Sequence, residues 1–179
     1  MIRHARGVAA HLRAEKADVC IPRRDDAMFR RTYPIEQYHS ERFANAHLDA
    51  LARPHGLPAG IDWTFGPVAL RAALAPCWLR CDGELWDAQV RFRPTSAQPH
   101  CLARAHGAPP RPHAQIVPFV RAARWEGASI VSHSVSYEHP PLMKEEEEGV
   151  PRWSEKRLEQ LNFLFRYVGD ALRETGPPS

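Results

Sequence analysis

Two short motifs contain residue types that bind metals and transfer protons. His39 and Glu41 stand two residues apart near the start of a helical pattern, and Pro76, Cys77 and Cys81 follow later in the chain. Cys77 and Cys81 are four residues apart, so a helical turn would project both thiols from one face, as two ligands of a single ion require. The chain has four cysteines. Because its first residues lack the apolar core of a signal peptide, reduced thiols or metal ligands are favoured over disulfides.

In this order and at this separation, the two motifs resemble the His-x-Glu and Pro-Cys-x-x-Cys signatures of the zinc-dependent nucleoside and nucleobase deaminases. The resemblance implies that His39, Cys77 and Cys81 bind Zn²⁺ and that Glu41 is the catalytic acid and base. In that chemistry the zinc lowers the pKa of its bound water to about 7, and the carboxylate carries the proton to the leaving amine. The implied substrate contains a nucleobase, either free or in single-stranded nucleic acid.

This chain departs from the deaminase signature at two points. Three residues, rather than two, stand between Cys77 and Cys81, and 34 residues separate Glu41 from Pro76. The thiols could instead be small buried groups on either side of Trp78. A structural zinc site with four protein ligands, and therefore no catalysis, is a further alternative. Its ligands would be Cys77, Cys81, Cys101 and either His100 or His106.

Arginine and aromatic residues are interleaved in two segments, a pattern typical of surfaces that contact phosphates and stack on bases. The first segment also includes Arg23, Arg24 and Phe29. The alternative is that these arginines face solvent from ordinary amphipathic strands. A second class of function follows, an accessory domain that is not an enzyme and that binds a protein or nucleic-acid partner. The residues predicted to contact nucleic acid are Arg30, Arg31, Tyr33, Arg91, Phe92 and Arg93.

Composition favours one globular domain over residues 1–179. Hydrophobic residues make up 44% of the chain and charged residues 25%, values that are ordinary for a globular protein. No run of about 18 apolar residues is present, so we expect no membrane span and a cytoplasmic location. The net charge of +3 permits nucleic-acid binding without requiring it.

The apolar periodicity predicts helices before and around the first motif, and strands elsewhere. We expect helices over residues 2–16 and 40–52, the second carrying His39 and Glu41 at its first turn. Residues 68–75 are ambiguous and favour a strand, and Cys77 opens a short helix after Pro76. The other predicted strands cover residues 18–21, 27–33, 85–93, 115–120 and 128–137.

The clearest predicted helix lies near the end of the chain, over residues 154–174, with Ser154 as its N-cap. Its apolar residues form one stripe at helical spacing, which predicts a core helix. Proline-rich loops are expected over residues 94–114 and 140–153. The fold class that results is α+β, or a three-layer α/β arrangement, with a mixed sheet of about five strands flanked by helices. The apolar stripe comprises Leu158, Leu161, Phe165, Val168 and Leu172.

Overall fold

A small mixed sheet stands at the centre of the computed structural model, which describes residues 2–79 and 116–168. The middle strand, β1 (Val19–Arg24), pairs in parallel with β3 (Ile130–Val135) and antiparallel with the two-residue β2 (Ala69–Leu70). In the parallel pair Val19 lies opposite Ile130, and Arg24 lies opposite Val135. The predicted mixed sheet is confirmed, but with three strands in the described part of the chain rather than five.

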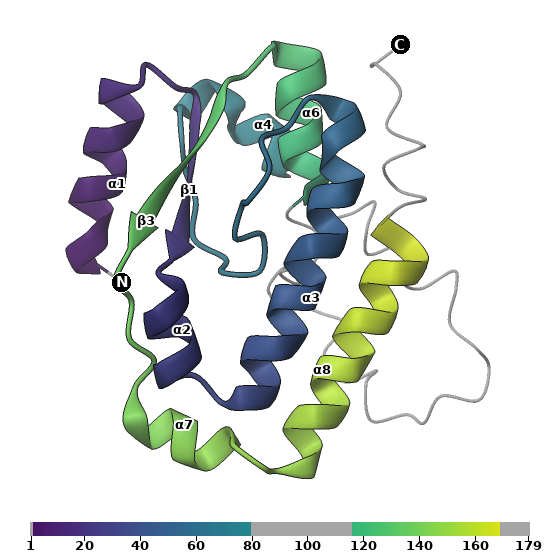
Figure 1. Ribbon diagram of the computed structural model, residues 1–179. Coiled ribbons are helices and arrows are strands. Elements are labelled where there is room, and N and C mark those ends of the chain that lie inside the picture. The colour runs from purple at the N-terminus through teal and green to yellow at the C-terminus, as the bar shows by residue number, and fades with distance from the viewer. Residues whose placement is uncertain (1, 80–115, 169–179) are drawn as a thin grey trace.

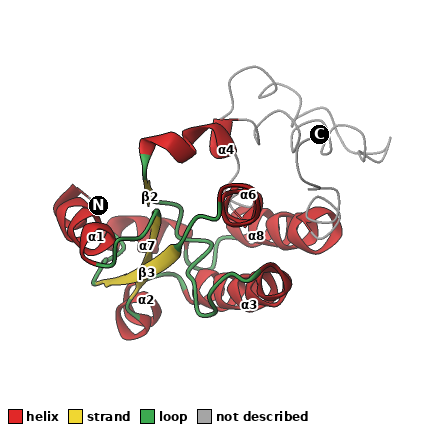
Figure 2. Ribbon diagram, turned by 90° about the horizontal axis from the view of Figure 1, so that it is seen from above, coloured by secondary structure: helices red, strands yellow, loops and turns green. Residues whose placement is uncertain are grey.

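Helices cover both faces of this sheet, as Figures 1 and 2 show. The helix α1 (Ile2–Ala14) lies on one face, and α3 (Ile35–Ala52) and α6 (Ile116–Glu126) lie on the other. The side chains of β1 alternate between the two faces, because successive residues of a strand point to opposite sides. Cys20 packs in the smaller core cluster with Val8 of α1, whereas Val19 and Ile21 pack in the larger cluster with α3 and α6.

Two of the predicted strands are helices. Residues 27–33 fall in α2 (Asp26–Thr32), whose N-cap Asp25 accepts a hydrogen bond of 2.9 Å from the backbone N–H of Met28. Of the strand predicted over residues 115–120, residues 116–120 fall in the first turns of α6 (Ile116–Glu126), where every residue from Ile116 to Ala122 is buried. A helix that is buried on all sides has no polar face, and its short apolar run cannot be told from a buried strand by periodicity. The predicted strand over residues 85–93 and the loop over 94–114 lie outside the described residues.

The chain between β2 and the second motif is mostly helical. After β2 come a single 3₁₀ turn, Ala72–Leu74, and the short helix α4 (Ala75–Leu79). The predicted strand over residues 68–75 is therefore reduced to two residues. Its alanines, which favour helix over strand, account for the difference. A 3₁₀ turn also follows α3, at Arg53–His55, and ends at Gly56, whose φ of 76° suits glycine.

The last third of the chain differs from the predicted loop and long helix. The segment expected to be an acidic loop contains α7 (Pro141–Glu147), and α8 (Pro151–Phe163) begins three residues before the expected N-cap at Ser154. Proline in the first turn of each helix is compatible with helix initiation, because those N–H groups have no intrahelical partner. A π-helical turn, Leu164–Val168, follows α8, and the chain beyond residue 168 is outside the described part.

The buried face of α8 and the turn after it includes only part of the predicted apolar stripe, since Leu161 and Val168 pack in the main core but Leu158 and Phe165 do not. Leu158 is 60% exposed and Phe165 is 40% exposed, whereas Leu164 and Val168 are buried. The buried side begins at Arg157, which is only 8% exposed. Arg157, Leu161, Leu164 and Val168 follow the spacing of one helix face. The prediction was wrong at Leu158 and Phe165 because it counted apolar residues alone and did not consider Arg157 for the buried face.

None of the helices in residues 2–79 and 116–168 has both the length and the apolar character needed to span a membrane.

Candidate functional site

The first motif lies one turn farther into its helix than predicted, because α3 begins at Ile35. His39 is exposed on α3, and its ring lies 5.1 Å from the ring of Tyr38. Glu41 is turned toward the protein, and its Oε2 lies 2.7 Å from the Nη1 of Arg24. The two residues of the motif therefore have different surroundings, the histidine in solvent and the carboxylate in an ion pair.

The second motif lies in the main core. Cys77 is 5% exposed, within the cluster that includes Trp63 and Phe119, and α4 packs against α6. Figure 1 places α4 at the end of the molecule where α3 finishes, whereas the first motif lies near the start of α3. Among the described residues, no group of three or more His, Cys, Asp or Glu side chains could hold a metal ion. Cys81 lies outside those residues, and the zinc site therefore stays a prediction.

Metal content tests this prediction. A deaminase site predicts about one zinc per chain, lost in both His39→Ala and Cys77→Ala. The structural alternative predicts zinc that persists in His39→Ala and is lost in Cys101→Ala. Elemental mass spectrometry on protein purified without chelators distinguishes these outcomes, and a zinc-free wild type would contradict both.

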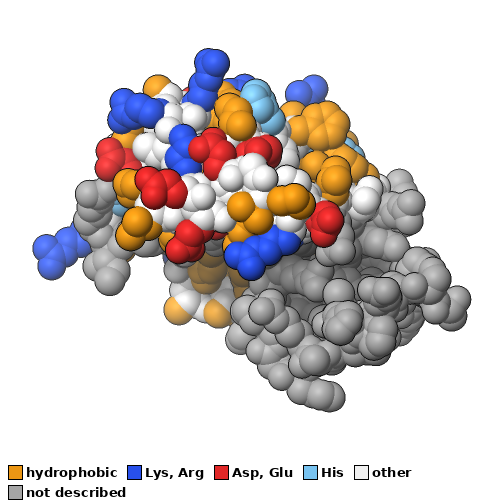
Figure 3. Space-filling model, turned by 90° about the horizontal axis from the view of Figure 1, so that it is seen from below, with side chains coloured by type: hydrophobic (Ala, Val, Ile, Leu, Met, Phe, Trp, Pro, Cys, Tyr) orange, Lys and Arg blue, Asp and Glu red, His pale blue; other side chains and the backbone are white. Residues whose placement is uncertain are grey.

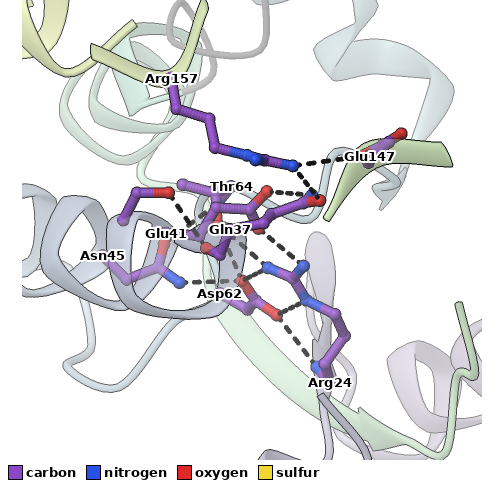
Figure 4. Close-up of polar contacts among 9 residues, drawn as sticks. Arg24, Gln37, Glu41, Asn45, Asp62, Thr64, Glu147 and Arg157 are labelled. Atoms are coloured by element: carbon purple, nitrogen blue, oxygen red, sulfur yellow. Dashed lines mark hydrogen bonds and ion pairs between the residues drawn. The ribbon is translucent and has the colours of Figure 1, made fainter. Parts of the chain in front are cut away.

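A buried guanidinium group organises the polar residues between the sheet and α3. Arg24, the last residue of β1, is 5% exposed. It makes a bidentate pair with Asp62, in which Nε donates to Oδ2 and Nη2 donates to Oδ1, each at 2.7 Å. Its Nη1 contacts Glu41, and its Nη2 also donates to Thr64 Oγ1 at 3.1 Å. One side chain thus joins β1, α3 and the loop after α3, as Figure 4 shows.

Charge pairing fixes the ionised state of this centre. Burial alone would raise the pKa of Asp62, but the hydrogen bonds and positive charge of Arg24 outweigh it and hold the pKa below the usual value. Burial likewise opposes the charge of Arg24, but the hydrogen bond to Asp62 and the charges of Asp62 and Glu41 raise its pKa. The two residues are therefore charged in the folded protein across the neutral range.

A second layer of hydrogen bonds extends from this centre to α8. Glu41 Oε1 accepts a bond of 2.6 Å from Gln37, and the Gln37 Oε1 accepts one of 3.2 Å from Nη2 of Arg157. The same Nη2 lies 3.1 Å from Glu147 of α7. A chain of polar contacts therefore links the end of β1 to the α7–α8 segment, through one face of α3.

The aromatic residues of the first interleaved segment, Phe29 and Tyr33, pack on the buried Arg24 guanidinium, and so does Phe65. The Cζ of Arg24 lies 3.7 Å from the ring centre of Phe29, 5.1 Å from that of Tyr33 and 4.9 Å from that of Phe65. Tyr33 is buried, and burial raises its pKa to about 12. The Tyr33 ring is therefore covered within the protein, whereas the sequence predicted that it contacts nucleic acid. Arg30 and Arg31 are exposed on α2, and Arg91, Phe92 and Arg93 lie outside the described residues.

The loop after α3 supplies partners that the sequence interpretation missed. Residues 61–64 alternate in direction: Ile61 and Trp63 enter the core, while Asp62 and Thr64 contact Arg24. Asn45 of α3 holds the polar side in place, since it donates to Asp62 at 2.9 Å and accepts from the Thr64 N–H at 3.1 Å. The alternation of Ile, Asp, Trp and Thr was a usable signal, because alternating apolar and polar residues indicate a segment with one buried and one polar side, here a turn closed by the Phe65 N–H and the Asp62 carbonyl.

An open groove of about 540 Å³ lies beside the charged centre, at the carboxyl ends of the parallel strands. Arg23, Arg24 and Asp25 line it from the end of β1, and Ser134 lines it from β3. In open α/β sheets this edge is where ligands bind. Its volume is within the range of small-molecule sites. The groove is therefore a candidate ligand site.

Most charges that line this groove already have partners within the protein. Asp26 pairs with Arg42 at 2.7 Å. Asp49 accepts from the Gly60 N–H at 2.8 Å and from the Trp63 Nε1 at 2.7 Å. Arg23 is exposed and has no carboxylate partner among the described residues. One guanidinium group is therefore available to a ligand.

Comparisons with protein-family models, with curated proteins and with solved structures found no match to this chain.

Proposed function

We propose that this chain is a non-enzymatic binding domain that takes a ligand with a single phosphate group, a mononucleotide, in the groove at the carboxyl ends of β1 and β3. The observation that carries the proposal is the Arg23 guanidinium in that groove, exposed and without a carboxylate partner among the described residues. A guanidinium binds phosphate oxygens through two parallel N–H donors, which gives both charge and direction.

The pairing of charges in the groove favours one phosphate over a polynucleotide, because a single lining guanidinium lacks a carboxylate partner among the described residues. Three arginines and four aspartates line it, and all except Arg23 and Asp25 are joined in ion pairs or in side-chain hydrogen bonds to other elements. Asp25 caps α2. A nucleic-acid strand is usually bound along a continuous basic surface. On the face that Figure 3 presents, acidic and basic side chains of the described residues are interspersed.

The closed ion-pair network supports binding over catalysis. Glu41, the carboxylate that the deaminase resemblance assigns to proton transfer, contacts Arg24, Gln37 and Thr64. A general base must lose and regain a proton near neutral pH. The contacts of Glu41 with Arg24, Gln37 and Thr64 instead hold its carboxylate in an internal network, as expected for a structural role.

Replacement of Arg23 tests this function. Arg23→Gln is expected to weaken the binding of a nucleoside monophosphate roughly tenfold, since a charge-assisted hydrogen bond is worth about 1.5–3 kcal/mol and solvent reduces that value at an exposed site. Titration calorimetry with the monophosphate and with the matching nucleoside measures the effect.

The matched control is Arg13→Gln, which removes the same charge from the exposed last turn of α1, outside the groove. We expect the control to bind like the wild type, and the nucleoside to bind weakly to all three proteins. Equal affinity of wild type and Arg23→Gln for the monophosphate would refute the proposal.

A further inference from the structure

A second, smaller cavity lies between α3 and the C-terminal helix, apart from the groove. It has a volume of about 70 Å³. One water needs at least about 10–15 Å³ of such volume, so this cavity has room for more than one water or for a very small molecule. Ala44 and Leu48 of α3 form one apolar wall, and Leu161 and Leu164 form the opposite wall. The body of a ligand bound here would be a short alkyl group.

One end of the cavity is polar and contains a hydrogen-bond donor without an acceptor. Arg157 lines the cavity and is 8% exposed. Its Nη2 donates to Gln37 and Glu147, but its Nη1 is buried and has no hydrogen-bond partner in the described part of the chain. Buried donors are nearly always paired in folded proteins. A ligand that brings an acceptor to Nη1 would satisfy the hydrogen-bonding capacity of this buried donor.

The same end of the cavity also presents an acceptor. Glu41 lines it, and its Oε1 accepts one bond, from Gln37, while Oε2 accepts from Thr64 and contacts Arg24. A carboxylate oxygen can accept two hydrogen bonds, so Oε1 has capacity for one more. Arg157 and Glu41 therefore face each other at one end of the cavity, from α8 and α3, and a ligand that offers the complementary pair matches both.

The surrounding charges favour a neutral ligand. An anion at this end would lie beside the Glu41 carboxylate, and each cation of the network already pairs with a carboxylate, so the repulsion would not be offset. A cation would lie beside the Arg157 guanidinium, and like charges in a buried site repel strongly. A carboxamide is neutral and carries one carbonyl acceptor and two N–H donors. The charged groups are Arg24, Arg157, Glu41, Asp62 and Glu147.

We infer that this cavity binds a small neutral carboxamide, with the carbonyl oxygen on Arg157 Nη1, an amide N–H on Glu41 and the alkyl group between Leu48 and Leu161. This site is separate from the groove and does not depend on the proposed nucleotide binding. Arg24 links the two sites, because it lines the groove and contacts Glu41 of the cavity.

Three probes of similar size and different charge test the inference: propionamide, propionate and propylamine. In methyl-detected NMR titrations of the full chain, propionamide is expected to shift the Leu48, Leu161 and Leu164 signals in a saturable way at roughly millimolar concentration. Propionate and propylamine are expected to bind at least tenfold more weakly. Equal shifts from all three probes would indicate unselective filling of an apolar gap and would overturn the inference, as would no saturable shift from the amide.

Two variants place the amide in this cavity. Ala44→Leu fills the cavity from α3 and should abolish the propionamide shifts, while Ala50→Leu makes the same change at an exposed position of the same helix and should leave them intact. Arg157→Lys keeps the positive charge but removes Nη1, and should weaken amide binding at least tenfold in protein whose spectrum remains folded. Binding that survives both Ala44→Leu and Arg157→Lys would contradict the inference.

Discussion

Asp62→Ala is expected to lower the free energy of unfolding by about 3–5 kcal/mol, the usual cost of removing one partner from a buried ion pair. Asp62 is 5% exposed and accepts both arms of the Arg24 guanidinium, together with the backbone N–H of Arg24 at 3.1 Å. Without the carboxylate, these donors stay buried and lose their acceptor. Because small domains have about 5–15 kcal/mol of stability, the loss should be plain in urea or thermal unfolding.

The matched control for this change is Asp26→Ala. Asp26 also pairs with an arginine at 2.7 Å, but both side chains of its pair with Arg42 are more than half exposed. Exposed pairs contribute about 0–1 kcal/mol, so the control should lose far less stability. Similar losses in the two variants would mean that the buried pair is no more important than the surface pair.

The Asp62 contribution should also depend on pH. Since the pKa of Asp62 is lower in the folded protein than in the unfolded chain, its stabilising effect is complete above the unfolded pKa of about 3.9 and is lost as the pH falls through the folded value. His139 is buried with a lowered pKa, so its protonation costs stability below about pH 6.5 in wild type and variant alike. The difference between wild type and Asp62→Ala should therefore be constant from pH 5 to 7 and shrink below about pH 4.

Sequence patterns predicted the elements in which buried residues recur at a regular spacing or form a continuous apolar run. The apolar run Val19-Cys20-Ile21 predicted β1, and the alternation in residues 128–137 predicted β3, because strands of a covered sheet are rich in β-branched residues. The helix α3 was predicted from its three- and four-residue spacing. In α2 the pair Phe29 and Tyr33 has helical spacing, but seven residues are too few for a clear period.

The charged centre could not be predicted from local patterns. Arg24 and Asp62 are 38 residues apart, and nothing near either residue identifies its partner. Arginine is rarely buried unless paired, so Arg24 was expected to contact a partner or to face solvent, and no role was predicted for Arg157. Each is buried because carboxylates from other elements meet it there. Such pairs depend on the tertiary fold, which sequence periodicity does not describe.

Trp63→Ala is expected to have an effect as large as Asp62→Ala, about 3–5 kcal/mol. Trp63 is 1% exposed, and its ring centre lies 5.5 Å from that of Phe119 in the main core. Its Nε1 donates to Asp49 at 2.7 Å. The substitution therefore leaves a large cavity and removes the donor to a half-buried carboxylate.

The tryptophan also positions the charged centre, because it anchors the segment that carries Asp62. With Trp63 buried in the core, the neighbouring Asp62 and Thr64 must point the other way, toward Arg24. Loss of the anchor should therefore weaken the ion pair as well as the core. Because Asp62 and Trp63 are adjacent and depend on the same loop, the losses in unfolding free energy caused by their substitution are expected to be non-additive. The double variant Asp62→Ala/Trp63→Ala should lose at least about 1 kcal/mol less than the sum of the single losses. Trp63→Phe keeps an aromatic ring in the core and should retain most of the Asp62 contribution. Additive losses in urea unfolding would show that the loop holds Asp62 in place without Trp63.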